Sequence, residues 1–232
     1  MDMLWEGLKQ AFRLLATGDR ETYRIMLLSL EVSGVATLLS MAAGLPLGVF
    51  LGLSRFPGRN ALLALVNMGM GLPPVVAGLL VSIVLWRSGP LGSLRLLYTP
   101  QAMIIAQFLL AAPLVTALTV AAIQQLNPKL RVQVLALGAS RWQMLLLLLR
   151  EARLPLLAAL MAGFGAVISE VGASLMVGGN ILGQTRVLTT ATVMEVGKGD
   201  FALAIALGVI LLLLVYSASF IITMLQQRGR PS

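Results

Sequence analysis

The sequence contains no cysteine and no histidine among its 232 residues, and only 9 residues are Asp or Glu. Without cysteine, the chain forms no disulfide and has no thiolate nucleophile. Without histidine, it lacks the most common general base and the most common metal ligand. These absences exclude a disulfide-stapled fold and argue against acid–base or metal-dependent catalysis.

The chain is instead rich in hydrophobic residues, which make up 58% of it and give a mean hydropathy of +0.93. A soluble domain cannot bury so much apolar surface. A helix of about 20 apolar residues crosses a bilayer, so the length suits about five spans. The apolar runs are continuous rather than alternating, which favours helices over a β-barrel. We therefore predict an all-α integral membrane protein.

Hydropathy and charge divide the chain into three parts. Residues 1–25 have the spacing of an amphipathic helix that lies in the membrane interface, and they lack the apolar core of a signal peptide. Residues 26–226 form the transmembrane domain, and residues 227–232 form a basic tail. The expected spans are residues 26–54, 60–86, 101–125, 144–177 and 201–226.

The basic residues indicate the orientation of these spans. Residues 55–59, residues 127–153 and the C-terminal tail lie on one side, and together they carry more Lys and Arg than the loops on the other side. Cytoplasmic loops are enriched in these residues. Discounting the partly acidic N-terminal segment, we expect the N-terminus outside and the C-terminus in the cytoplasm.

A polar stretch, residues 127–143, interrupts the apolar sequence between the third and fourth spans. Asn127 followed by Pro128 is typical of a helix start, and Gly138 permits the left-handed turn that ends a helix. These residues predict a short cytoplasmic helix.

The predicted short helix carries Leu130, Val134 and Leu137 on one face. An apolar stripe too short to cross the membrane needs a groove in another protein. We expect this helix to dock on a cytoplasmic partner, and the alternative is an ordinary solvated loop.

The stretch "LRVQVLALGASRWQ", residues 130–143, resembles the coupling loop of ABC importer permeases, in which a Glu-Ala-Ala triplet precedes a glycine at a fixed spacing. Residues 137–139 match this pattern, whereas Val-Gln-Val at 132–134 replaces the triplet. The resemblance implies that the contacts to the ATPase come from Leu130, Val134, Leu137, Gly138, Ala139, Ser140 and Arg141.

Two further stretches are similar to spans of permeases for the tetrahedral oxyanions tungstate, molybdate and sulfate. They are "GMGLPPVVAGLL" at residues 69–80 and "ISEVGASLMVGGNILGQTRVLTTA" at residues 168–191. With residues 26–59, the likeness covers nearly the whole chain and favours the tungstate branch. It implies a type I ABC importer permease in a prokaryotic inner membrane. The implied partners are a second copy of the chain, two ATPase subunits that carry ATP and Mg, and an extracytoplasmic substrate-binding protein.

Several residues within the spans are candidates for the translocation path. Pro73 and Pro74 interrupt the second span and free carbonyl groups, so they either bend a helix or line the path. Glu170 is an intramembrane carboxylate. Because it would repel an anion, we expect it to bond backbone or hydroxyl groups near a helix break, or to act in the gate. The candidate path and gate residues are Pro73, Pro74, Glu170, Gly172, Gly178, Gly179 and Asn180.

Two features near the outer side have more than one interpretation. The stretch from Gly178 to Asn180 either directs backbone N–H groups at an anion or forms a turn that re-enters the membrane. Arg186 either guides an oxyanion, contacts the delivery protein, or is an ordinary surface arginine.

The sequence lacks a nucleotide-binding loop, because Gly197-Lys198 is not followed by Ser or Thr and has no matching upstream glycine. We therefore expect a transport subunit rather than an enzyme, with no cofactor of its own and no nucleic-acid partner. The rival functions are a molybdate or sulfate permease, an intramembrane transferase or protease, and a stand-alone channel. The scattered acidic residues disfavour an enzyme, and the docking helix disfavours a channel.

Overall fold

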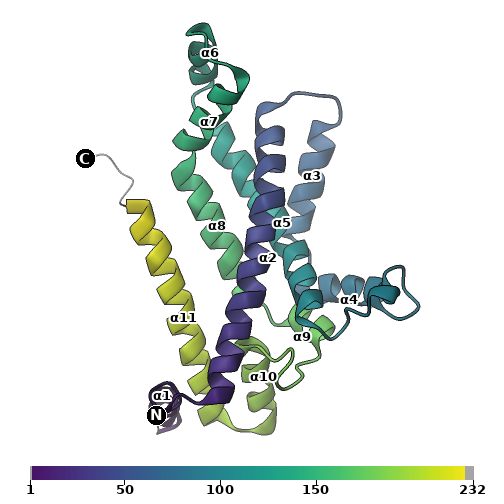
Figure 1. Ribbon diagram of the computed structural model, residues 1–232, viewed down its shortest axis with the longest axis vertical. Coiled ribbons are helices and arrows are strands. Elements are labelled where there is room, and N and C mark those ends of the chain that lie inside the picture. Colours follow the sequence, from purple (N-terminus) through teal and green to yellow (C-terminus); the bar gives the residue numbers. More distant parts are fainter. Residues whose placement is uncertain (1, 228–232) are drawn as a thin grey trace.

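The computed structural model describes residues 2–227 and is all-helical over that range, as expected (Figure 1). Residues 228–232 of the predicted tail lie outside the described residues. The helices are α1 (Asp2–Thr17), α2 (Arg20–Leu53), α3 (Arg59–Met70), α4 (Pro74–Leu85), the 3₁₀ turn η1 (Gly92–Leu94), α5 (Pro100–Gln124), α6 (Pro128–Ala136), α7 (Arg141–Glu151), α8 (Arg153–Ile168), α9 (Gly172–Gly178), α10 (Leu188–Lys198) and α11 (Phe201–Gln227).

Three helices, α2, α5 and α11, are each long and apolar enough to cross a membrane. Two bent pairs, α3 with α4 and α8 with α9, bring the number to five if each pair is one span. The expected span at residues 60–86 is therefore broken, with an angle of 102° between α3 and α4. Gly71 ends α3, and Pro74, which has no N–H to donate to the preceding turn, begins α4.

The expected span at residues 144–177 is also divided, into α7, α8 and α9. Ala152 separates α7 from α8, and Pro155 lies in the first turn of α8, where its missing N–H costs no hydrogen bond. Helices α8 and α9 meet at an angle of 56°. Residues 144–177 are more than one straight span needs, and the chain divides them among three helices.

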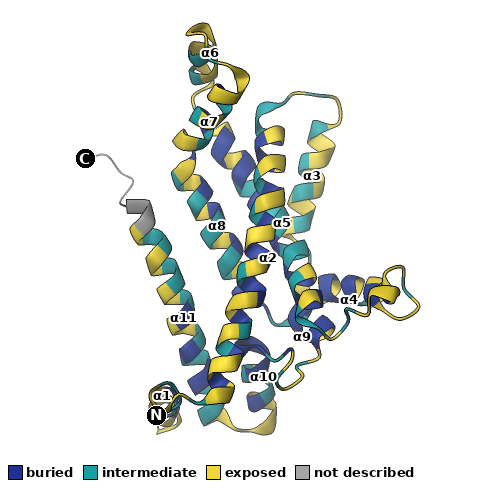
Figure 2. Cartoon of the chain, viewed as in Figure 1, coloured by how far each residue is buried: buried dark blue, intermediate teal, exposed yellow. Residues whose placement is uncertain are grey.

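Helices α2 and α5 lie side by side and form the centre of the molecule (Figure 1). A stripe of glycines on α2 lets the two backbones approach. A Cβ atom built on Gly48 would lie 2.5 Å from Cβ of Thr119, and one on Gly52 would lie 2.9 Å from Cγ2 of Ile123. Buried residues gather along this seam, whereas the outer faces of α2 and α3 are largely exposed (Figure 2).

The two ends of the molecule differ. Helix α1 packs across the start of α11 at one end, and α6 and α7 form the other end (Figure 1). Helix α1 buries Gly7 and Ala11 against the protein. Its apolar side chains Leu4, Trp5 and Phe12 are exposed, as an interfacial helix requires.

We predict that Gly48→Ala lowers the stability of the protein by about 1–3 kcal/mol, because the added methyl group overpacks the α2–α5 seam. Gly34→Ala on the same helix is the matched control, since its Cβ would meet no atom within 4 Å. The measurement is the unfolding temperature of both variants in detergent. Equal shifts would contradict the close approach at Gly48.

Candidate functional site

The coupling loop, residues 127–143, contains a short helix with defined ends. The Asn127 side chain accepts a hydrogen bond from the Lys129 N–H at 2.9 Å, and Pro128 is the first helical residue. Gly138 has a φ of 85°, and the Ala139 N–H donates to the Val134 carbonyl at 3.3 Å. This is a glycine-dependent helix stop, so the predicted start and end of the helix are confirmed.

The rest of the coupling loop starts α7. The Ser140 hydroxyl accepts a hydrogen bond from the Gln143 N–H at 3.2 Å, and the Gln143 side chain accepts one from the Ser140 N–H at 2.8 Å. This reciprocal cap satisfies two backbone donors at once. The polar residues between the two helices therefore build a tight turn with a defined geometry.

Helix α6 projects from the end of the molecule, and none of its described residues is buried (Figure 2). Leu137, which follows it directly, is 87% exposed, and Val132 is 68% exposed. Leu130 and Val134 are only half-buried, so the outermost apolar surface includes Val132 in addition to the predicted stripe. These apolar side chains are therefore exposed on the surface of the single chain and could be covered only by a partner.

Two arginines connect this end to α2. Nη1 of Arg131, on α6, donates to the Leu53 carbonyl at 3.1 Å. Nε of Arg59, at the start of α3, donates to the Leu51 carbonyl at 2.8 Å. These carbonyls belong to the last turn of α2, which has no intrahelical donors for them. Helix α6 is therefore joined by a hydrogen bond to the end of α2.

Glu170 lies at the break between α8 and α9 and is 8% exposed. Its Oε1 accepts a hydrogen bond from the Ala173 N–H at 2.8 Å, in the first turn of α9. Its backbone carbonyl accepts one from the Thr189 hydroxyl at 3.0 Å. The expected bond from Glu170 to backbone at a helix break is confirmed, and its role in the gate stays a prediction.

The two broken pairs meet, because α4 packs on α9. A Cβ on Gly78 would lie 2.8 Å from the Ala173 Cα, and one on Gly172 would lie 2.8 Å from Cγ2 of Val75. The Pro73–Pro74 break and the Glu170–Gly172 break are therefore neighbours in space, although they are far apart in sequence.

Sequence reasoning missed a polar contact beside these breaks. Nε2 of Gln107 on α5 donates to the Ser174 hydroxyl on α9 at 3.2 Å, and both residues are buried. Oε1 of Gln107 has no partner among the described residues. The only signal for this contact in the sequence is an amide side chain, Gln107, flanked by apolar residues inside a helix.

The stretch from Gly178 to Asn180 is a turn. Gly179 and Asn180 have φ angles of 69° and 52°, in the left-handed region. The Gly179 N–H donates to the Leu175 carbonyl at 2.9 Å, and an anion contact by this stretch stays a prediction. The Gly178 carbonyl accepts a hydrogen bond from the Thr185 hydroxyl. The chain thus turns back from α9 toward α10.

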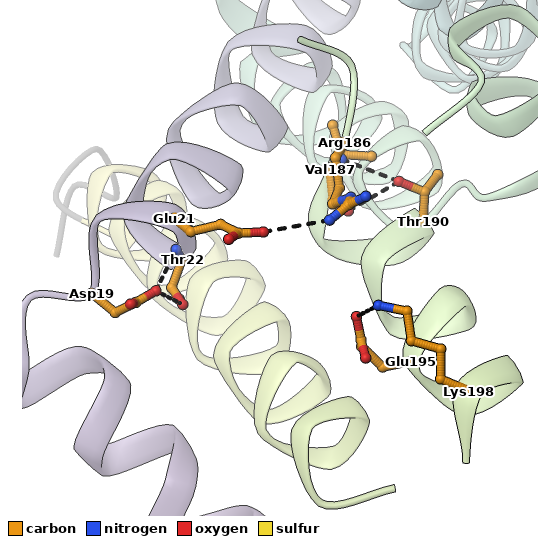
Figure 3. Close-up of polar contacts among 8 residues, drawn as sticks. All are labelled: Asp19, Glu21, Thr22, Arg186, Val187, Thr190, Glu195 and Lys198. Carbon is orange, nitrogen blue, oxygen red and sulfur yellow. Dashed lines mark hydrogen bonds and ion pairs between the residues drawn. The ribbon is translucent and has the colours of Figure 1, made fainter. Parts of the chain in front are cut away.

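Arg186 belongs to a polar cluster at the start of α2 (Figure 3). Its Nη1 lies 3.4 Å from Oε1 of Glu21, and the Arg186 side chain is only 15% exposed. Nearby, hydrogen bonds from the hydroxyl and N–H of Thr22 hold the pKa of the Asp19 carboxyl below its ordinary value. Arg186 is thus paired within the chain, and a contact to an anion or a binding protein stays a prediction.

We predict that Glu170→Ala lowers the stability of the protein by about 1–3 kcal/mol, because the buried Ala173 N–H loses its acceptor. Glu170→Gln keeps an oxygen at this position and serves as the matched control, with a much smaller effect expected. Thermal unfolding in detergent measures both. If the two variants are equally destabilised, the negative charge rather than the hydrogen bond is what matters.

Known proteins resemble the chain over most of its length. Residues 44–231 match a family described as binding-protein-dependent transport system inner membrane component. The tungstate uptake system permease protein TupB of Peptoclostridium acidaminophilum is 40% identical, covering 98% of this chain and 100% of that protein. A probable anion ABC transporter permease protein of Haloferax volcanii is 44% identical, covering 87% and 90%. The molybdenum transport system permease protein ModB of Escherichia coli K12 is 27% identical, covering 83% and 91%.

The fold also has a solved counterpart. A bacterial alginate ABC transporter, crystallised with an alginate pentasaccharide-bound periplasmic protein, contains a chain that superposes with a TM-score of 0.74. The alignment covers 93% of this chain and 84% of that chain at 21% identity. At this identity the likeness concerns the fold alone.

Proposed function

The chain belongs to the family of inner membrane components of binding-protein-dependent transport systems, and we propose that it is the permease subunit of an ATP-driven tungstate importer. The observation that carries the proposal is the 40% identity, over 98% of this chain, to a protein named as a tungstate uptake permease. The molybdenum and sulfate permeases are less similar, at 27% and 28% identity, so molybdate and sulfate are the alternative cargoes. The chain itself catalyses no bond chemistry.

The partners of this permease follow from the same family. They are a second copy of the chain, two copies of an ABC ATPase that bind ATP and Mg, and an extracytoplasmic substrate-binding protein. The exposed apolar surface of α6 supports docking of the ATPase at that end. The α6 end then faces the cytoplasm together with the C-terminus, and α1 lies at the outer side, in agreement with the basic loops.

In the proposed mechanism, movement of the ATPase is transmitted from the coupling loop through α2 and α5 to the two helix breaks. The ATPase displaces the coupling loop, and Arg131 passes this displacement to the end of α2. Helix α2 is packed tightly against α5, so the two move as one body. Helices α4 and α9 contact α5 and each other, which supports a mechanism in which such a movement alters the translocation path at the two breaks. Pro73, Pro74, Glu170, Gly172, Gly178, Gly179 and Asn180 are the proposed path and gate residues.

The function is tested in proteoliposomes that contain the chain with its ATPase and binding protein. We expect ATP-dependent uptake of tungstate that excess molybdate or sulfate inhibits only weakly, because the relative named for tungstate is the more similar one. The control replaces ATP with ADP. Dominant uptake of molybdate or sulfate would change the cargo, and no ATP-dependent uptake by an assembled complex would refute the proposal.

We expect Leu137→Asp to lower ATP-driven uptake about tenfold or more, because it places a charge in the centre of the apolar docking surface. The measurement combines uptake with co-purification of the ATPase. Membrane insertion of the variant stays normal, because the Leu137 residue is 87% exposed and its side chain is not part of the buried core.

The glycine stop of the coupling loop offers a matched pair of variants. Gly138 and Gly58 both have positive φ angles, 85° and 89°, and a Cβ on either would meet no atom within 4 Å. Gly138→Ala and Gly58→Ala therefore impose similar backbone strain. Only Gly138→Ala is expected to reduce coupled uptake, and equal losses in both variants would count against a special role of this loop.

A further inference from the structure

A cavity of about 1300 Å³ lies between the ends of α2 and α5 and the helices α6 and α7. We refer to it as the arginine groove. Most of its lining residues are apolar, and we call these its walls; four are arginines, and we call these its rim. The walls include Leu45, Val49, Phe50, Met144, Leu145 and Leu148, and the rim carries Arg55, Arg59, Arg131 and Arg141.

The arginine groove contains positive charge without a matching negative charge, because none of the described residues that line it is Asp or Glu. Arg59 and Arg131 each use one donor on a carbonyl of α2. The side chains of Arg55 and Arg141 make no hydrogen bond or ion pair among the described residues and are exposed. Guanidinium groups present several donors that match phosphate oxygens, so the rim is suited to a phosphate group.

The apolar part of the groove and its basic part succeed each other as the acyl region and the headgroup region of a membrane do. The apolar wall of α2 belongs to its last turns, and the basic rim begins just after α2 ends at Leu53. A phospholipid has the same division, with acyl chains next to a phosphate. Basic pockets beside transmembrane helices bind anionic lipid headgroups.

The arginine groove lies beside the surface that we assign to the ATPase and shares only Arg141 with the expected ATPase contacts. Val132, Leu135 and Leu137 form the exposed apolar face of α6, and none of them lines the groove. Only the first residues of the coupling loop, through Arg131, and its last ones, from Arg141, reach it. One ligand in the groove and a partner protein on α6 are therefore compatible.

We propose that the arginine groove is a binding site for one anionic phospholipid, whose phosphate lies among the arginines and whose acyl chains lie along α2 and α7. This lipid site does not depend on the proposed transport function and requires only that the chain spans a membrane. Because Arg131 also bonds the end of α2, the bound lipid lies at the joint between the coupling loop and the spans.

Trp142 lines the groove and provides a probe for this lipid. The chain has 3 tryptophans, so the variant Trp5→Phe/Trp86→Phe leaves Trp142 as the fluorophore. This full-length variant is reconstituted in vesicles that contain brominated phosphatidylglycerol or brominated phosphatidylcholine, and quenching is titrated. We expect half-maximal quenching at an about fivefold or more lower mole fraction of the anionic lipid.

A matched pair of charge variants tests the rim. Arg55→Gln/Arg141→Gln should bring the two lipids to within about twofold of each other, since both arginines face the groove. Arg13→Gln/Arg87→Gln removes the same charge elsewhere and should leave the preference unchanged. Circular dichroism checks that all variants keep their helices, as expected for side chains that bond nothing else in the described part.

Each of four results would overturn the proposal. Equal quenching by both lipids, or a preference that survives Arg55→Gln/Arg141→Gln, would show that the arginines select no lipid. No quenching by either lipid would show that protein, such as a second copy of the chain, covers the groove. Loss of the preference when inorganic phosphate replaces chloride at equal ionic strength would assign the rim to a soluble anion.

Discussion

The close packing of α2 on α5 is the contact on which the rest of the structure depends. Between helices in lipid there is little hydrophobic driving force, so association relies on close approach and dispersion. The glycines of α2 supply that approach, with Gly48 against Thr119 and Gly52 against Ile123. Other elements join α5 in the same way, since Gly69 of α3 contacts Pro113 and Gly163 of α8 contacts Val115. Helix α5 is thus the common support of the fold.

This support connects the coupling loop at one end with α9 toward the other end. At one end, α6 reaches the last turn of α2 through Arg131. Toward the other end, α9 approaches α5 closely, where a Cβ on Gly178 would lie 2.9 Å from Sδ of Met103. The breaks at Pro74 and Glu170 are held between these contacts. In the proposed mechanism, the closely packed pair of α2 and α5 transmits movement from the coupling loop to the broken helices, and this changes the translocation path.

The four arginines at the α6 end fall into two pairs that differ in their hydrogen bonding. Arg59 and Arg131 satisfy the terminal carbonyls of α2, which would otherwise lack donors. Arg55 and Arg141 have no such partner in the described part of the chain, so their charge remains available at the membrane boundary. In sequence, all four contribute in the same way to the basic side that we expect to face the cytoplasm. Only their positions around the arginine groove separate structural arginines from those that can bind a ligand.

The sequence by itself determined the features that depend on neighbouring residues. Hydropathy identified the apolar segments but not the breaks within two of them. Asn127, Pro128 and Gly138 defined α6, and Glu170 was expected to bond backbone at a break, because caps and helix stops act within one turn. The tertiary structure alone decided the 102° turn between α3 and α4, the exposure of Val132 and the pairing of Arg186 with Glu21. It also placed Gln107 beside Ser174 and brought the two breaks together. Each of these depends on which distant segments pack against each other, and a single sequence has no local signal for that choice.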